Sequence, residues 1–282
     1  MEKEPLQKLA TLSHEHRMAV FRLLLRRYPD EVPAGEIGTA LSLRPSTASV
    51  YLSALMDAGL IGQRRQGTSL LYRSNIDAMR DLMAFLFSDC CRGRPDLCPP
   101  LTVANSDDRH RGTDRTYNVL FICTGNSARS IFAETLLRDL GGGRFNAYSA
   151  GTAPYSELNP YAVSLLAAKG HDTAPLNSKN IREFQGADAP VMDFVFTVCD
   201  RAANENCPAW HGQPISAHWG MPDPVKATGS DAEKTLAFQH SYAALKNRIR
   251  AFTALPFDTL DKISLQKAVD DIGGTNEREP FQ

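Results

Sequence analysis

The 282-residue sequence has no apolar run approaching 18 residues, the length that a membrane-spanning helix needs. It also lacks an excess of charge of one sign, since 31 Lys and Arg residues stand against 32 Asp and Glu residues. A membrane-spanning protein and a strongly basic nucleic-acid binder are therefore excluded. Any contact with DNA has to come from local placement of charge. Internal repeats and low-complexity tracts are absent as well.

The first residues, Met1 to Glu4, are followed by an amphipathic segment and not by an apolar secretion core. We therefore expect a cytoplasmic protein that makes no membrane contact. In that reducing compartment cysteines are more often ligands or reactive groups than disulfide partners. The chain has six of them, which are Cys90, Cys91, Cys98, Cys123, Cys199 and Cys207.

Residues 99–116, PPLTVANSDDRHRGTDRT, form the clearest linker, because they combine Pro, Gly, Asp and Ser without any hydrophobic period. The linker divides the chain into a first domain, residues 1–98, and a second domain, residues 117–282. Both lengths suit an ordinary domain.

The first domain has mainly helical periodicity, with apolar residues three and four apart. Two short β-like runs, residues 60–64 and 69–73, surround Gln66-Gly67 and predict a hairpin. A last helix is predicted from about residue 75 to 87. The order of helix, turn, helix and hairpin predicts a winged helix-turn-helix fold.

The second domain alternates strands and helices, which indicates a parallel sheet covered by helices on both faces. We predict an α/β three-layer domain with a four-stranded parallel sheet. The expected strands are residues 118–122, 147–150, 193–198 and 214–218, and the expected helices are residues 130–140, 160–169, 230–252 and 259–272.

The segment from Cys123 to Ser130, CTGNSARS, joins a predicted strand to a helix N-terminus. Backbone N–H groups of such a loop and the helix dipole form a cradle for a tetrahedral oxyanion, and the Arg129 guanidinium can bind two of its oxygens. The same field predicts a lowered pKa for Cys123, which would act as the nucleophile. A buried cysteine in a glycine turn is the alternative, but strand, cysteine, arginine and helix all fall in register. The predicted oxyanion-binding residues are Thr124, Gly125, Asn126, Ser127, Ala128, Arg129 and Ser130.

This loop resembles that of the low-molecular-weight tyrosine phosphatase fold, and its sequence is similar to the arsenate reductase branch, over about Tyr117 to Leu255. The resemblance implies that Asp223, in the segment HWGMPDP, is the general acid. It also implies that Cys199 and Cys207 form a redox segment. Val225 stands where phosphatases usually carry tyrosine, which argues against a phosphatase activity of the second domain.

A phosphatase needs one cysteine, whereas reduction of arsenate needs two electrons, which thiols supply by forming a disulfide. The hypothesis is a relay in which Cys123 attacks arsenic, Cys199 attacks Cys123, and Cys207 resolves the disulfide. Thioredoxin, or a small thiol with glutaredoxin, would regenerate the thiols. The alternatives are two structural thiols at positions 199 and 207, and a second domain that is a protein tyrosine phosphatase or a non-catalytic oxyanion sensor.

Some relatives of this fold bind potassium, and Asn126, Glu134 and Ser149 resemble part of that site. Lys179 stands where an acidic ligand would be expected, so its ammonium group could take the place of the cation. We therefore predict no requirement for an alkali metal. Ala128 replaces a second cysteine found in some reductases, and the spacing from Cys199 to Cys207 is one residue longer than in the best-known thioredoxin-coupled pattern.

In the first domain, polar residues flank the apolar face of the second helix of the motif. Ser46, Thr47, Ser49 and Tyr51 could reach base edges in a major groove. At the hairpin, basic side chains could hold DNA phosphates, and these are Arg64 and Arg65. A solvated face on a protein-binding winged helix is the alternative.

The stretch from Ser46 to Ile61, STASVYLSALMDAGLI, resembles the ArsR/SmtB-type arsenic-responsive repressors. Cys90, Cys91 and Cys98 follow the last helix, and three soft thiolates suit trigonal arsenite or antimonite. No histidine lies in that segment, which weakens a zinc site, and surface thiols are the alternative. Binding would reshape the last helix, an expected dimer element, and lower the affinity for DNA.

These patterns predict a bifunctional arsenic-resistance protein in which an arsenite-responsive repressor is fused to an arsenate reductase. We expect no tightly bound cofactor, arsenite as the sensor ligand and an external thiol as reductant. Operator DNA and a second copy of the chain, joined through the first domain, are the expected partners. A DNA-binding regulator with a phosphatase or an oxyanion sensor as its second domain is the alternative.

Overall fold

The computed structural model describes residues 3–90, 115–186, 188–205, 210 and 213–274. The chain divides into two units, Met1–Gly112 and Thr113–Gln282, each with its own hydrophobic core. The division falls inside the predicted linker, much of which lies outside the described residues, so the exact domain boundaries stay a prediction. Among the described residues, no helix has both the length and the apolar character needed to cross a bilayer.

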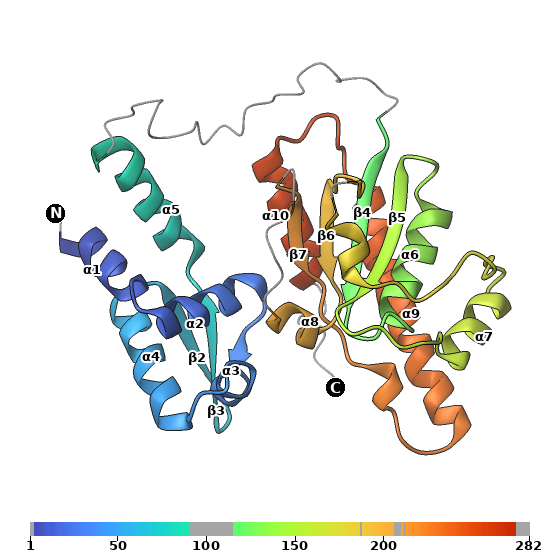
Figure 1. The fold of residues 1–282 in the computed structure, drawn as a ribbon, viewed down its shortest axis with the longest axis horizontal. Helices are drawn as coiled ribbons and strands as arrows, with labels where there is room; N and C mark the ends of the chain where they lie inside the picture. Colours follow the sequence, from blue (N-terminus) through green and yellow to red (C-terminus); the bar gives the residue numbers. More distant parts are fainter. Residues whose placement is uncertain (1–2, 91–114, 187, 206–209, 211–212, 275–282) are drawn as a thin grey trace. The chain divides into compact units, whose positions relative to one another are not determined.

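The first unit is mainly helical (Figure 1). Its helices are α1 (Lys3–Leu12), α2 (Glu15–Arg26), α3 (Ala34–Ala40), α4 (Pro45–Asp57) and α5 (Ile76–Phe85), and a π-helical turn, η1 (Leu86–Cys90), continues α5. Val20, Phe21 and Leu24 of α2 pack in one core with Leu52 and Leu55 of α4. That arrangement follows from apolar residues at helical spacing on both elements.

A small antiparallel sheet completes the first unit. Strand β3 (Ser69–Ser74) lies between β1 (Val32–Pro33) and β2 (Ile61–Gln66). Gln66 pairs with Ser69, so the hairpin turns on two residues, the first of which is Gly67 with a positive φ of 59°. The predicted winged helix-turn-helix fold is confirmed, and each hairpin strand is one residue longer than expected.

The second unit contains a four-stranded parallel sheet in the order β5-β4-β6-β7. The strands are β4 (Tyr117–Cys123), β5 (Phe145–Gly151), β6 (Phe194–Thr197) and β7 (Ile215–His218). The helices are α6 (Arg129–Leu140), α7 (Pro160–Ala168), α8 (Asp200–Asn204), α9 (Asp231–Thr253) and α10 (Lys262–Gly273), with short 3-10 turns η2 (Ile181–Phe184) and η3 (Pro224–Lys226). The predicted α/β class and the four parallel strands are confirmed.

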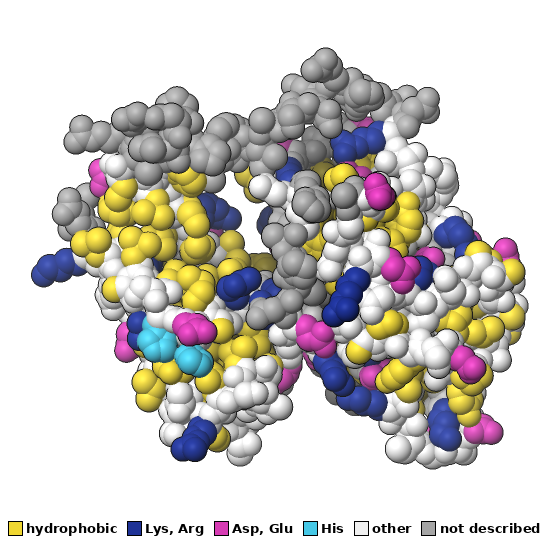
Figure 2. Space-filling view, in the orientation of Figure 1, with side chains coloured by type: hydrophobic (Ala, Val, Ile, Leu, Met, Phe, Trp, Pro, Cys, Tyr) yellow, Lys and Arg dark blue, Asp and Glu magenta, His cyan; other side chains and the backbone are white. Residues whose placement is uncertain are grey.

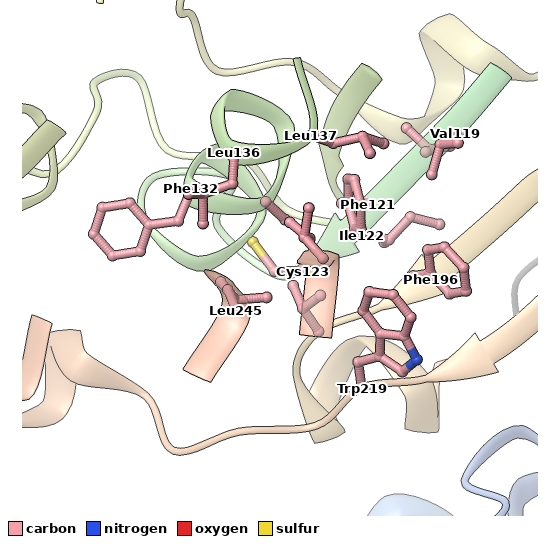
Figure 3. Close-up of a cluster of buried hydrophobic side chains, with 14 of the residues drawn as sticks. Val119, Phe121, Ile122, Cys123, Phe132, Leu136, Leu137, Phe196, Trp219 and Leu245 are labelled. Carbon is pink, nitrogen blue, oxygen red and sulfur yellow. The ribbon is translucent and has the colours of Figure 1, made fainter. Parts of the chain in front are cut away.

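Helix α6 packs on β4, β5 and α9, and α10 packs on β7 and α9. Aromatic rings fill the space against the sheet, and the Trp219 indole stacks on Phe196 with ring centroids 4.1 Å apart. Figure 3 shows Cys123 among the buried side chains of this core, so the end of β4 is anchored there. The carboxyl ends of β4 and β6 are thereby held rigidly, and that edge of the sheet carries the candidate site.

Several element ends differ from the sequence prediction for local reasons. Helix α10 begins three residues later than expected, because the Asp261 side chain accepts the Ser264 N–H and acts as the N-cap. Helix α9 begins at a capping box made by Ser230 and Glu233. Figure 2 shows basic and acidic side chains interspersed over the visible face, in keeping with the near-neutral charge of the chain.

Candidate functional site

The loop after β4 encloses the Cys123 sulfur. The Asn126 N–H donates to Sγ at 3.1 Å, and the Ser130 hydroxyl lies 2.9 Å from it. The loop turns at Asn126, which has a positive φ of 43°. Its side-chain amide donates to Ser130 and Ser149, at 2.9 and 2.8 Å, and so ties the loop to α6 and β5. The loop is therefore preorganised around the sulfur.

Burial raises the pKa of the Cys123 thiol, because the side chain is only 3% exposed. The neighbouring Cys199 sulfur raises this pKa further, whereas Ser130 and Arg129 lower it. The sequence-based prediction of a lowered pKa is therefore wrong for this arrangement. The pKa is raised because desolvation of the sulfur outweighs the opposite effects of the Ser130 hydrogen bonds and the Arg129 guanidinium.

A cavity of about 260 Å³ opens in front of the sulfur. Five of the predicted oxyanion-binding residues line it. Asn126 and Ser130 do not line it, but their hydrogen bonds hold the loop and contact the Cys123 sulfur. The lining residues of the loop are Cys123, Thr124, Gly125, Ser127, Ala128 and Arg129, and the walls include Tyr155, Cys199, Arg201, Asp223 and Lys226. The Tyr155 ring lies so close to Gly125 that a Cβ there would meet it at 2.5 Å.

The Arg129 guanidinium reaches across the cavity to the segment after β7. It forms an ion pair with Asp223 at 2.9 Å and donates to the Met221 carbonyl at 3.1 Å. Asp223 also caps η3 by accepting the Val225 N–H at 3.2 Å. The sequence prediction gave Arg129 and Asp223 separate roles, and the structure shows that they form one pair. A bound oxyanion has to compete with Asp223 for the guanidinium.

Cys199 lies beside the loop, as the relay requires. Its sulfur is 3.4 Å from the Thr124 hydroxyl and lines the same cavity as Cys123. It is the N-cap of α8, where it accepts the Ala202 N–H at 3.4 Å. Both Cys123 and Cys199 are free and buried. Cys207 lies outside the described residues.

Lys179 takes a position close to the one that the sequence suggests. Its ammonium group is 3.1 Å from Glu134 and 3.0 Å from the Asn177 carbonyl, and Glu134 accepts the Ser149 hydroxyl. The Lys179 and Glu134 side chains are both 14% exposed. A positive charge that belongs to the chain therefore occupies the neighbourhood of Asn126 and Glu134.

Because of this ammonium group, we expect arsenate turnover to differ by less than about twofold between potassium and sodium buffers of equal ionic strength. The measurement is the steady-state rate as potassium replaces sodium. Lys179→Met is the matched control, since it leaves the Glu134 carboxylate without its cation and should create a response to potassium. A clear stimulation of the wild-type chain by potassium would contradict the prediction.

Helix α4 presents an exposed stripe on the side away from its core. Ser46 and Ser49 lie on it, and Thr47 is half-buried at its edge. Tyr51 is also half-buried, because its ring packs against His14 and His16, with centroids 5.1 and 5.7 Å apart. The stripe also contains two residues that were not predicted from the sequence. These are Val50, which is 64% exposed, and the exposed Ser53. The helical spacing of Ser46, Ser49, Val50 and Ser53 could have identified them.

The two arginines of β2 are not equivalent. Arg64 is bonded to Glu31 through both Nε and Nη2, at 2.7 and 2.5 Å, and lies three residues before the turn. Arg65 lies next to it and is exposed. Holding a phosphate therefore requires Arg64 to leave its ion pair, so the prediction for Arg64 is weakened. Arg73 of β3 is exposed as well and was not predicted.

Of the three candidate sensor cysteines, the structure describes Cys90. It is free and exposed at the end of η1. Cys91 and Cys98 lie outside the described residues, so the arrangement of the three sulfurs stays a prediction.

Comparison with known proteins finds a matching family model for each of the two units. Residues 118–266, more than half of the chain, match the family model described as low molecular weight phosphotyrosine protein phosphatase, and residues 12–64 match a helix-turn-helix domain. The chain therefore belongs to the low molecular weight phosphotyrosine protein phosphatase family, with a helix-turn-helix domain preceding the phosphatase-like domain. Within that family its second unit is of the arsenate reductase type.

An arsenate reductase of Halalkalibacterium halodurans is 36% identical over 134 residues, which are 48% of this chain and 93% of the relative. The solved arsenate reductase of Archaeoglobus fulgidus is 23% identical and covers 49% of this chain and 99% of its own, with a TM-score of 0.40. A homodimeric winged helix-turn-helix domain from Mycobacterium bovis, described as a possible ArsR-family regulator, is 26% identical. It covers 33% of this chain and 82% of its own, with a TM-score of 0.26.

Proposed function

We propose that the chain is an arsenate reductase fused to an arsenite-responsive repressor, and that reduction proceeds by a relay through Cys123, Cys199 and Cys207. One observation carries the enzymatic part of this proposal. Two free cysteines, Cys123 and Cys199, line one cavity with the Arg129 guanidinium. A phosphatase requires only one of these sulfurs, whereas a two-electron reduction requires a second thiol within reach of the first.

In the first step the Cys123 sulfur bonds to arsenic. One arsenate hydroxyl leaves as water with the proton that the thiol gives up, and in this proposal Asp223 delivers that proton. Arg129 and the loop N–H groups hold the remaining oxygens.

In the second step the Cys199 thiolate attacks the Cys123 sulfur. The S–S bond forms, the S–As bond breaks, and its electron pair stays on arsenic, which leaves as arsenite. Cys207 then attacks Cys199, which produces the Cys199–Cys207 disulfide and frees Cys123. An external thiol, either a thioredoxin or a small thiol with glutaredoxin, reduces this disulfide. The relay needs reduced cysteines, which supports a cytoplasmic location.

The relay is tested by trapping cysteines after one turnover. The full, reduced chain is mixed with one equivalent of arsenate, or separately with an excess of an aryl phosphate, and is quenched with an alkylating agent for mass spectrometry. We expect one arsenite and one Cys199–Cys207 disulfide per chain with arsenate. Repeated release of phenol without a disulfide would instead favour a tyrosine phosphatase, and no product from either compound would favour an oxyanion sensor.

The regulatory part rests on the helix-turn-helix match and on the exposed stripe of α4. We propose that Ser46 and Ser49 hydrogen-bond to base edges in a major groove and that Arg65 contacts phosphate. Arsenite would bind at Cys90, Cys91 and Cys98 and lower the affinity for operator DNA. The repressor is proposed to act as a homodimer through the first unit, since paired recognition helices read two half-sites.

Val50 leads to a specific prediction about the DNA sequence. It is the apolar residue in a stripe of serines, and an exposed isopropyl group in a major groove is matched by a thymine methyl group. Duplexes selected by the full chain from a random pool should therefore contain a thymine whose replacement by deoxyuridine weakens binding by about 3- to 10-fold.

Val50→Ala is the matched variant for this test, because alanine keeps the helix and removes the two methyl groups. In that variant the same replacement of thymine by deoxyuridine should have little effect on the dissociation constant. An equal loss of affinity in the wild type and in Val50→Ala would show that another residue reads the methyl group.

A further inference from the structure

His218, the last residue of β7, is fully shielded from solvent, and each of its ring nitrogens has a polar partner. Nδ1 lies 2.8 Å from the Thr197 hydroxyl, and Nε2 lies 3.2 Å from a carboxylate oxygen of Asp200. A buried imidazole held at both nitrogens has one orientation. The mechanism described above gives this residue no role.

The two partners of His218 belong to different elements. Thr197 is the last residue of β6 and is paired in register with His218. Asp200 is the first residue of α8, directly after Cys199. The imidazole therefore connects the end of β6 to the first turn of the helix that carries the relay cysteine.

The chain after His218 is packed tightly against this connection. A Cβ on Gly220 would lie 2.4 Å from His218 Nε2 and 2.8 Å from the Asp200 carboxylate. Only glycine lets the backbone pass so close to the pair. Arg248 also holds this segment by donating to the carbonyls of Trp219 and Gly220, at 2.7 and 3.1 Å.

Helix α8 needs such a tether. It has five residues, too few for its own hydrogen bonds to hold it in place. Its N-cap sulfur must nevertheless face Cys123, since formation of an S–S bond requires the two sulfurs to approach along a defined line. The 3.4 Å contact between Cys199 and the Thr124 hydroxyl shows that α8 already holds the sulfur against the loop.

We propose that His218 is the positioning residue for Cys199, and that it acts through its hydrogen bond to Asp200. This inference rests on the proposed relay. The step affected is attack of the Cys199 thiolate on Cys123, in which the S–S bond forms and the S–As electron pair reduces arsenic. Binding of the oxyanion and attack by Cys123 use the loop from Cys123 to Ser130. Neither His218 nor Thr197 lines the cavity in front of that loop, whereas Asp200 does.

Two substitutions of His218 separate its two contacts. The asparagine amide of His218→Asn can replace Nδ1 beside Thr197 but is too short for Asp200, whereas the glutamine amide of His218→Gln can replace Nε2 and reach Asp200. In single-turnover mixing with arsenate, we expect His218→Asn to form the Cys199–Cys207 disulfide at least about tenfold more slowly than the wild type. His218→Gln should recover most of that rate.

Binding of an oxyanion at the Cys123 loop serves as the control measurement, because a general structural defect would weaken it. Protection of Cys123 from iodoacetamide by inorganic phosphate should give the same dissociation constant, within about twofold, in all three proteins. Asp200→Ala removes the other partner at a side chain that is 51% exposed, so it should fold and show the same slow disulfide.

The outcomes are distinct. Unchanged disulfide rates in His218→Asn or in Asp200→Ala would overturn the positioning role, and so would a parallel loss of phosphate protection. A wild-type chain that produces no Cys199–Cys207 disulfide would instead refute the relay itself, and with it the premise of this inference.

Discussion

Replacing Cys199 with serine should end arsenate reduction after at most one turnover. A serine hydroxyl can neither attack the Cys123 sulfur as a thiolate nor store the oxidising equivalents in an S–S bond. The Cys123–arsenic bond would then form and persist. We expect multiple-turnover activity to fall by at least about 10³-fold, the scale of loss when a catalytic nucleophile is removed.

This variant should keep its fold. Cys199 caps α8 by accepting the Ala202 N–H, and serine is a good N-cap residue in the same position. Phosphate should therefore protect Cys123 from alkylation as it does in the wild type. Cys90→Ser is the matched control, because it removes an exposed cysteine of the other unit and should turn over normally. Sustained turnover by Cys199→Ser would refute the relay.

Replacing Cys90, Cys91 and Cys98 together with serine should abolish the response of DNA binding to arsenite. Arsenite is held by soft thiolates, and serine hydroxyls do not replace them. We expect arsenite to weaken operator binding by the wild-type chain by about 5- to 150-fold, the usual range of coupling between two sites. In the triple variant the change should stay within about twofold, as measured by a fluorescence anisotropy titration with selected duplex DNA.

Cys123→Ser is the reciprocal control for the sensor. It should still release DNA when arsenite is added, because its sensor cysteines are intact. With arsenate and a thiol reductant, however, the wild type should release DNA and Cys123→Ser should not, since only the wild type makes arsenite. Release of DNA by the triple variant in arsenite would show that the sensor lies elsewhere.

The loop from Cys123 to Ser130 could be predicted from the sequence because its signal is local. A strand, a cysteine, an arginine six residues later and a helix start occupy one continuous stretch, and backbone geometry alone turns them into an oxyanion cradle. The winged helix could be predicted for a similar reason. The apolar spacing of Ala48, Leu52 and Leu55 defines the buried side of α4, and the structure buries all three.

Other features depend on groups that are distant in the sequence. Arg129 and Asp223 are 94 positions apart, and only the fold shows that they form an ion pair. Tyr51 is directed toward His14, which precedes α2, and His16 of α2, and Arg64 is directed toward Glu31. The pKa of Cys123 was predicted in the wrong direction, because helix dipole and loop donors can be inferred from the motif but the depth of burial cannot.

By itself, the sequence determined the two-domain organisation, the fold of each unit and the position of the cysteine loop between β4 and α6, since hydrophobic period and motif spacing act over a few residues. Tertiary structure alone decided that Cys199, 76 positions after Cys123, opens on the same cavity. It also decided that the His218 imidazole holds the helix following Cys199. The physical reason is that β4, β6 and β7 are parallel neighbours, so their carboxyl ends meet at one edge although the chain between them is long.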